Sequence, residues 1–196
     1  NSGHKLISGF PEGRRLWLNV RFFDASGALI GEVNPYRPLV TRRDAGGNEE
    51  YVSGGELVRT RDDLVYEAKM ASAFTKESDT FHFVLATDRT KDNRIPPKGF
   101  DVTAAAVRLA LPRAAGNDAA AMFSAEEYAG GFDDVAIEKP PGTVNWIATL
   151  YYQTTSKEYV TFLRDEINGT AASLTLPATS RESRAYIVQT DAFFAP

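Results

Sequence analysis

The stretch RRLWLNVRFFDASGALIGEV, residues 14–33, predicts the β-hairpin from which the fold is built. Apolar side chains recur at every second position of its first half, as expected for a strand with one buried face. Those side chains are Leu16, Leu18, Val20 and Phe22. DASG at residues 24–27 has the composition of a turn, and an apolar run resumes at Leu29. We therefore expect two antiparallel strands joined by a short turn.

Further strands are predicted after a long polar stretch. Residues 34–63 contain RRDAGGNEE and SGGE, which favour a surface loop or a loose excursion. The later strand candidates are residues 64–74, 80–88, 102–111, 133–138 and 142–154. Residues 102–111 also fit a helix, but the turn residues around them favour a strand. SAEEYA at residues 124–129 is expected to form a short helical turn.

Two helices are predicted after this run of strands. TSKE at residues 155–158 and TSRE at residues 179–182 each match a capping box, in which a hydroxyl and a glutamate satisfy the first backbone amides. The first helix spans about 156–168 and ends at Gly169, and the second spans about 180–194. The sequence thus predicts one mainly β domain over residues 1–196, an antiparallel β-sandwich with two C-terminal helices.

Composition excludes several classes of protein. The net charge is -4, which argues against nucleic-acid binding, since that requires a basic surface. No apolar run approaches the roughly 20 residues of a membrane-spanning helix. The chain has no cysteine, so it forms no disulfide and cannot attach haem through a CxxCH motif.

Few side chains have the pattern of a catalytic site. GxSxG, P-loop and GxGxxG motifs are absent from the sequence. His82 lies in TFHFVLA, where a histidine packed on a strand is the simpler interpretation. The acidic pairs Asp62–Asp63 and Asp133–Asp134 each join neighbours that point apart, so neither is a natural acid–base couple. We therefore expect a protein that is not an enzyme.

Two further polar motifs have simple explanations. Asp88, Asp92 and Asn93 supply oxygen atoms near a turn and form a candidate calcium site, although an Asx-turn is the simpler interpretation. Asn168 begins an N-x-[ST] sequon. We expect Asn168 to close the preceding helix, and its glycosylation stays open.

His4 has a more unusual setting, in GHKLISGFPEGRR. The surrounding glycines and proline allow a flat partner to approach the backbone closely. Arg14 and Arg15 follow, and guanidinium groups pair well with carboxylates. A histidine that hydrogen-bonds within its own loop is the simpler interpretation of the residues alone, although they do not decide between the two.

Three segments carry a resemblance to a known family. They are GHKLISGFPEGRRLWLNVRFFDASG at 3–27, DNRIPPKGF at 92–100 and ATLYYQTTSKEYVTFL at 148–163. In this order, and with the closing FFAP, they resemble the β-rich C-terminal domain of exported multihaem c-type cytochromes. Ile7 and Ser8 stand where that family often has Pro and Thr, and the family's CxxCH motifs are missing.

The resemblance implies a role in electron transfer at an extracellular or periplasmic location. His4 would be a distal axial ligand to a haem c that another segment or subunit carries, and Arg14 and Arg15 would contact its propionates or an acidic neighbour. Phe10 and Trp17 would line the docking surface. The chain would be the C-terminal part of a longer cytochrome or a separate subunit, and a homo-oligomer or filament is compatible with this.

Two other classes remain as alternatives. A surface carbohydrate-binding, adhesion or structural β-sandwich module without haem would present exposed aromatic side chains, for which Tyr36, Tyr51 and Tyr128 are candidates. A hydrolase would need His82 within hydrogen-bond reach of a serine or carboxylate in a pocket.

Overall fold

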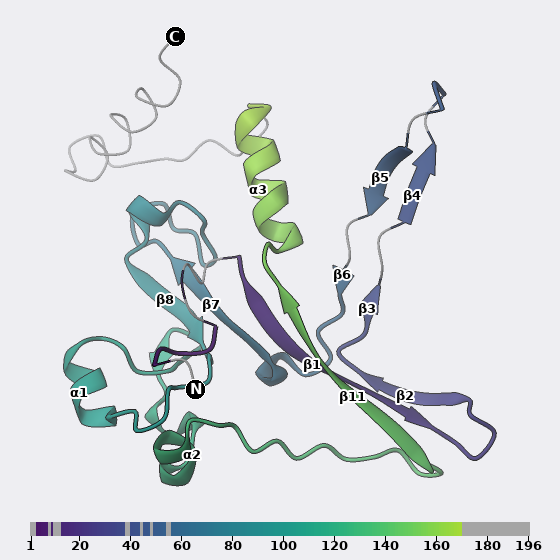
Figure 1. Ribbon diagram of the computed structural model, residues 1–196. Helices are drawn as coiled ribbons and strands as arrows, with labels where there is room; N and C mark the ends of the chain where they lie inside the picture. Colours follow the sequence, from purple (N-terminus) through teal and green to yellow (C-terminus); the bar gives the residue numbers. More distant parts are fainter. Residues whose placement is uncertain are drawn as a thin grey trace.

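Figure 1 shows the computed structural model, which describes residues 3–7, 9, 13–37, 40–43, 45–47, 49–53 and 56–169. Its main element is a seven-stranded antiparallel sheet with the order β10-β9-β8-β7-β1-β11, in which β2 also pairs with β1. The strands are β1 (Arg15–Phe23), β2 (Leu29–Val33), β7 (Val65–Ala71), β8 (Asp88–Asp92), β9 (Arg113–Ala114), β10 (Asn117–Asp118) and β11 (Asn145–Gln153). The mainly β prediction is confirmed. The sandwich is not, because the described residues contain no second large sheet facing the first.

The predicted hairpin is confirmed and lies at the centre of the sheet. β1 pairs along its whole length with β11, while β7 and β2 share its other edge at opposite ends. The turn closes with a hydrogen bond from the Gly27 amide to the Asp24 carbonyl, at 3.1 Å. The Asp24 carboxylate also accepts from the Ser26 amide at 2.8 Å, as in an Asx-turn.

Both faces of β1 are buried. Alternate residues of a strand point to opposite faces, so Leu16 and Trp17 lie in different apolar clusters. Leu16 packs with Ile7, Tyr66 and Ile95. Trp17 packs with Val65, Leu57, Tyr36 and Tyr151. β1 therefore connects the two halves of the core.

The prediction of a strand-free surface loop over residues 34–63 is wrong, because four short strands pair within this polar excursion. β3 (Tyr36–Arg37) pairs with β6 (Glu56–Leu57), and β4 (Val40–Arg43) pairs with β5 (Glu49–Ser53). These strands form an arm that extends away from the sheet (Figure 1). The 3-10 helix η1 (Asp62–Leu64) follows it.

Asn34 fixes the base of this arm. It has a positive φ of 47° and is fully buried. Its side-chain oxygen accepts from the amides of Thr60 and Arg61 at 3.0 and 2.9 Å, so it joins the two ends of the arm. A single asparagine thus replaces backbone pairing where the arm meets the sheet.

Three predicted strands are wrong. Thr80 makes one isolated bridge, and the following residues form the 3-10 helix η2 (Phe83–Leu85). Residues 102–111 contain α1 (Val102–Val107), because Asp101 caps the amide of Ala104 at 3.0 Å and three alanines favour a helix. Residues 133–138 form no ladder with another strand.

The helical predictions fare better. The 3-10 helix η3 (Ala120–Met122) precedes α2 (Ala125–Gly130), which confirms the short helical turn and begins with a capping box between Ser124 and Glu127. α3 (Lys157–Ile167) is confirmed, but its N-cap is Ser156 instead of Thr155. The Ser156 amide donates to the Gly13 carbonyl at 2.6 Å, which fixes this residue at the helix entrance.

The end of the first predicted helix is also confirmed, because Asn168 is its C-cap. The second helix, predicted over about 180–194, lies outside the described residues. Among those residues, no helix combines the length and the apolar character needed to cross a membrane.

Candidate functional site

His4 lies on a short N-terminal segment that runs beside the end of β8. The Leu6 amide donates to the Ile95 carbonyl at 2.8 Å, and the two residues form an isolated antiparallel bridge. Ile7 continues into the apolar cluster with Leu16 and Tyr66. This anchoring holds His4 near the strand end, with its side chain exposed.

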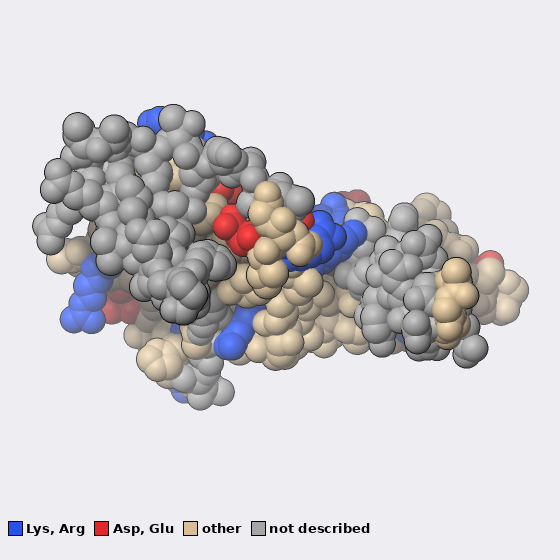
Figure 2. All heavy atoms as spheres, turned by 90° about the horizontal axis from the view of Figure 1, so that it is seen from above, with Lys and Arg blue, Asp and Glu red and all other residues tan. Residues whose placement is uncertain are grey.

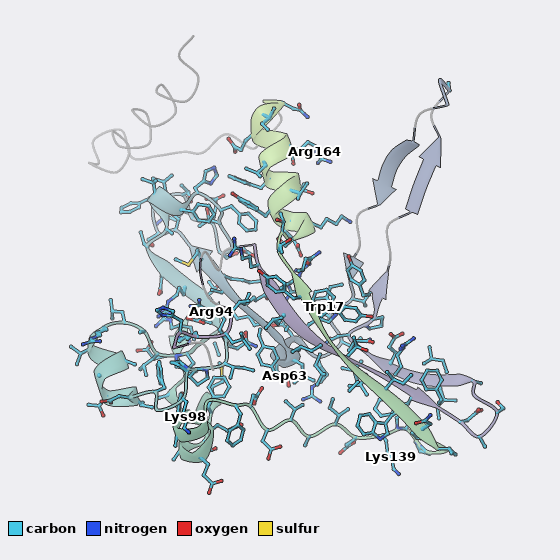
Figure 3. The ribbon with its side chains drawn as sticks, in the orientation of Figure 1. Trp17, Asp63, Arg94, Lys98, Lys139 and Arg164 are labelled. Carbon is cyan, nitrogen blue, oxygen red and sulfur yellow. The ribbon has the colours of Figure 1, made fainter. Side chains whose placement is uncertain are left out.

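A buried carboxylate organises the cations around this segment. Asp92 is fully buried and accepts from Lys5 Nζ at 2.9 Å and from Arg94 Nε and Nη2 at 2.8 and 3.0 Å. Arg89 Nη1 donates to the same carboxylate. Three cations thus share one anion, which leaves an excess of positive charge. Figure 3 shows Arg94 beside the N-terminal segment.

The ionisation of this cluster follows from its burial. Burial by itself would raise the pKa of Asp92, but its hydrogen bonds and charge interactions with Arg94 and Lys5 outweigh that and hold the pKa below its ordinary value. Burial lowers the pKa of Lys5, and the charge of Asp92 partly offsets this. Asp92 is therefore a stable anion at neutral pH.

An open pocket of about 540 Å³ lies over this cluster. Its lining includes His4, Lys5, Arg89, Arg94, Pro97 and Phe100. Lys5 Nζ lies 5.8 Å from the centroid of the Phe100 ring. The volume is within the range of cofactor and small-molecule sites. An imidazole, several cations and an apolar wall suit a flat ligand with anionic groups.

Arg14 and Arg15 do not line this pocket. Arg15 is buried and donates to Gln153 Oε1 at 2.7 Å and to Glu158 at 3.1 Å, so it links β1, β11 and α3. Both arginines line a separate small pocket beside Ser156. The cations that accompany His4 are instead Lys5, Arg89 and Arg94. No local sequence pattern could identify Arg89 in this role, because it lies on β8, far from His4 along the chain.

Trp17 is a core residue, and the prediction that it lines a docking surface is wrong. Trp17 is only 2% exposed. Tyr151 stacks on it at a centroid distance of 5.1 Å, and Tyr36 packs at 5.3 Å. Phe10, the other residue assigned to that surface, lies outside the described residues.

The candidate calcium ligands do not converge. Asp92 directs its carboxylate to Lys5 and the two arginines, while Asp88 pairs with Arg113 at 2.6 Å. Asn93 donates to the Asp63 carbonyl at 2.8 Å. Within the described part of the chain, no group of three or more histidine and acidic side chains has the arrangement of a metal site.

His82 lies between two carboxylates and not on a strand. Its Nδ1 is 3.2 Å from Glu77 Oε2, and its Nε2 is 3.4 Å from Glu166 Oε1 on α3. Phe162 of the same helix packs against the ring at a centroid distance of 4.9 Å. These contacts connect His82 to the docking of α3.

The two acidic pairs line the same pocket, which the sequence did not indicate. This pocket has a volume of about 660 Å³ and includes both pairs with Tyr66. The Tyr66 hydroxyl donates to Asp133 at 2.5 Å. Burial raises the pKa of Asp133, and the charges of Glu127 and Asp63 act in the same direction. Neighbouring basic side chains pair with some of the acids, for example Arg61 with Asp63 at 2.6 Å.

The tyrosines proposed as exposed platforms have other roles where they are described. Tyr128 is 5% exposed, so the prediction of an exposed ring is wrong. It stacks on Phe100 and donates to the Ala120 carbonyl at 2.9 Å. Tyr36 packs on Trp17. The side chain of Tyr51 lies outside the described residues.

Charges on the surface are mixed. On the face seen in Figure 2, basic and acidic side chains are interspersed with uncharged ones.

No protein-family model matches the chain, and neither the curated proteins nor the solved structures contain a significant match.

Proposed function

We propose that this chain is a non-catalytic β-rich domain or subunit of an exported multihaem cytochrome assembly that transfers electrons. In this role it covers haem groups carried by another segment or subunit, and His4 is a distal axial ligand to one of them. The observation that carries the proposal is the exposed imidazole of His4 on an open pocket whose other side chains include three cations.

The residues of this pocket fit the edge of a haem c. A neutral imidazole is a common axial ligand, and two histidines keep the iron six-coordinate, which suits electron transfer. Lys5, Arg89 and Arg94 would neutralise the propionates, while Phe100 would contact the apolar part of the macrocycle. The chain has no cysteine, so the thioether attachment would belong to the partner.

The fold supports this role because the residues next to His4 are anchored to the sheet and its adjoining segment. Lys5 is joined to Asp92, and Leu6 is joined to Ile95, in the two residues that directly follow His4. An axial ligand on a held segment loses less conformational freedom when it binds iron than one on an unattached tail.

The test uses a haem c peptide that has one histidine ligand and an open sixth position. On addition of the chain, the Soret and visible bands should change from high-spin to low-spin. His4→Ala should abolish the change. His82→Gln is the matched control, because these are the only two histidines, and it should retain the change.

Two results would contradict the proposal. One is a haem peptide that stays high-spin at saturating concentrations of chain. The other is a low-spin shift that His4→Ala leaves intact. In the native assembly, reduced and oxidised spectra without c-type bands would exclude the haem partner altogether.

A further inference from the structure

Strand β11 forms one edge of the main sheet and lacks the features that usually protect such edges. Among the described residues, its only strand partner is β1. It is nine residues long, with the sequence NWIATLYYQ, and contains neither charge nor proline. Its register with β1 is regular over all nine residues. Natural edge strands are typically short, charged or bulged, so β11 resembles a strand that receives a partner.

The opposite edge of the same sheet is built differently. β10 has only two residues, and its Asp118 pairs with Arg113 at 2.7 Å. One edge is therefore short and charged, whereas the other is long and uncharged. This contrast within one sheet indicates that the openness of β11 is specific to that edge.

The face of β11 that carries its even-numbered residues is also uncovered. Trp146, Leu150 and Tyr152 are 59%, 58% and 51% exposed, and Val144 just before the strand is 70% exposed. On β1, by contrast, the facing residues Leu16, Val20 and Phe22 are buried. The covered apolar surface thus stops at β1, and the outermost strand continues it into solvent.

We propose that a second copy of this chain pairs with β11, antiparallel and about a two-fold axis at Thr149. In a continuous sheet, opposite residues lie on the same face, so two identical strands must be centred on a residue. Centring on Thr149 is the choice that pairs all nine residues. Trp146 then faces Tyr152 of the second copy, and Ala148 faces Leu150.

The sequence of β11 fits this pairing at each position. On the exposed apolar face, two aromatic pairs flank two pairs of a small and a large aliphatic side chain. On the other face, Asn145 meets Gln153, Ile147 meets Tyr151 and Thr149 meets itself. Aromatic pairs and Thr–Thr pairs are among the favourable cross-strand combinations, and no like charges meet.

The interface would be small. Val144, Trp146, Ile147, Leu150 and Tyr152 are 43% to 70% exposed. Edge pairing covers only part of these side chains, so together with the backbone of β11 the buried area is expected near the low end of specific interfaces, about 600 Å² per partner. A two-fold interface uses the same patch on both copies, so it closes as a dimer and does not continue into a filament.

The first experiment measures the mass of the full chain by light scattering after size-exclusion chromatography, from about 1 to 100 μM. The wild type should be a dimer at the upper concentrations. Leu150→Lys should be a monomer throughout, because it introduces a charge opposite Ala148. Val107→Lys is the matched control, since Val107 is 85% exposed on α1, and it should dimerise like the wild type.

The second experiment tests the register by cysteine cross-linking, which the cysteine-free chain makes simple. Opposite residues in an antiparallel pair have Cα atoms about 4.5–5.5 Å apart, within the range that a disulfide spans. Thr149→Cys should therefore form disulfide-linked dimers under mild oxidation. Asn145→Cys should not, because its counterpart would lie about 27 Å away along the strand.

Several results would overturn the proposal. These are a wild-type chain that stays monomeric at about 100 μM, a dimer that Leu150→Lys leaves intact, or equal cross-linking of the two cysteine variants. A monomer that binds haem as proposed above would indicate that another part of the assembly covers β11. The dimer proposal does not depend on the haem proposal, so either one can be refuted while the other stands.

Discussion

Replacing Asp92 by asparagine tests whether one buried carboxylate holds the N-terminal segment to the sheet. The substituted side chain is nearly the same size but uncharged, while Lys5, Arg89 and Arg94 remain around it. The carboxylate is fully buried, and the three cations have side chains that are 10%, 18% and 15% exposed. The substitution thus leaves three poorly solvated cations without their shared anion.

The expected loss is large for a single isosteric change. Removing one partner of a buried ion pair costs about 3–5 kcal/mol, because the remaining charge is uncompensated. Residual exposure lets water solvate the cations in part, so we expect a decrease of about 3 kcal/mol in the free energy of unfolding. For a chain of this size, that corresponds to a decrease of roughly 6–12 °C in Tm.

Urea denaturation at neutral pH, followed by tryptophan fluorescence, measures this change. Asp88→Asn is the matched control on the same strand, because Asp88 also pairs with an arginine but is 56% exposed. Its loss should stay below about 1 kcal/mol, as for other surface ion pairs. If the two variants were equally destabilised, burial would not govern the strength of these pairs and the reasoning would be refuted.

The pH dependence provides a second check on the same variant. The pKa of Asp92 in the folded chain lies below its ordinary value of 3.8. Its contribution is therefore fully present above about pH 3.8 and is lost as the pH falls through the lower, folded pKa. The difference between the wild type and Asp92→Asn should shrink under acid conditions. A constant difference would point to packing and not to charge.

Three further predictions concern other parts of the fold. Ser156→Ala should lower the free energy of unfolding by about 1 kcal/mol through loss of the α3 cap, while Thr155→Ala should change it little. Thermal denaturation compares the two variants. A larger loss for Thr155→Ala would indicate that Thr155 is the N-cap, as the sequence predicted. In the same assay, Gly131→Ala should lower the free energy of unfolding by about 3 kcal/mol and Gly99→Ala by about 1 kcal/mol. Both glycines have a positive φ, but of the two only Gly131 would place a new Cβ against backbone, at 2.5 Å from the Lys98 nitrogen. Equal losses would exclude this contact as the cause. Burial alone would raise the pKa of Glu67, but its hydrogen bonds and charge interactions hold it below the ordinary 4.5. Its stabilising effect is therefore lost as the pH falls through that lower value, and Glu67→Gln should make the free energy of unfolding depend less on pH below about pH 4.5. An unchanged pH dependence would contradict this.

Local patterns in the sequence were sufficient for the hairpin, β7, β11, α2 and α3. The hairpin turn and the two helices depend on interactions within a few residues, such as the Asp24 turn or the capping box at Ser124. Strand β11 pairs with a distant strand but was recognisable from its alternating apolar side chains. The arm over residues 34–63 was missed because its base depends on Asn34, whose partners Thr60 and Arg61 lie 26 and 27 positions away. Residues 102–111 were misassigned because the turn signals around them received more weight than the Asp101 cap and the alanines.

The candidate site shows the same division. His4 stands out in the sequence because of its glycine-rich setting, and the structure does expose it on a pocket. The cations beside it could not be predicted, since Lys5 and Asp92 are 87 positions apart and meet only after the N-terminal segment docks on β8. Arg15 resembled a ligand-binding residue but links strands and helix within the core. Its partners Gln153 and Glu158 lie too far along the chain for any local pattern to identify.

The central position of β1 also sets an order in which the chain must assemble as it is synthesised. β1 and β2 can close as a hairpin early, but Arg15 and Gln153, at one end of the β1–β11 pairing, are 138 positions apart. At about 5–20 residues per second, a ribosome needs roughly 7–28 s to make that stretch. During this time the edge of β1 that later pairs with β11 has no strand partner. Until β11 is made, the nascent chain therefore exposes an unpaired strand edge at which another chain could pair.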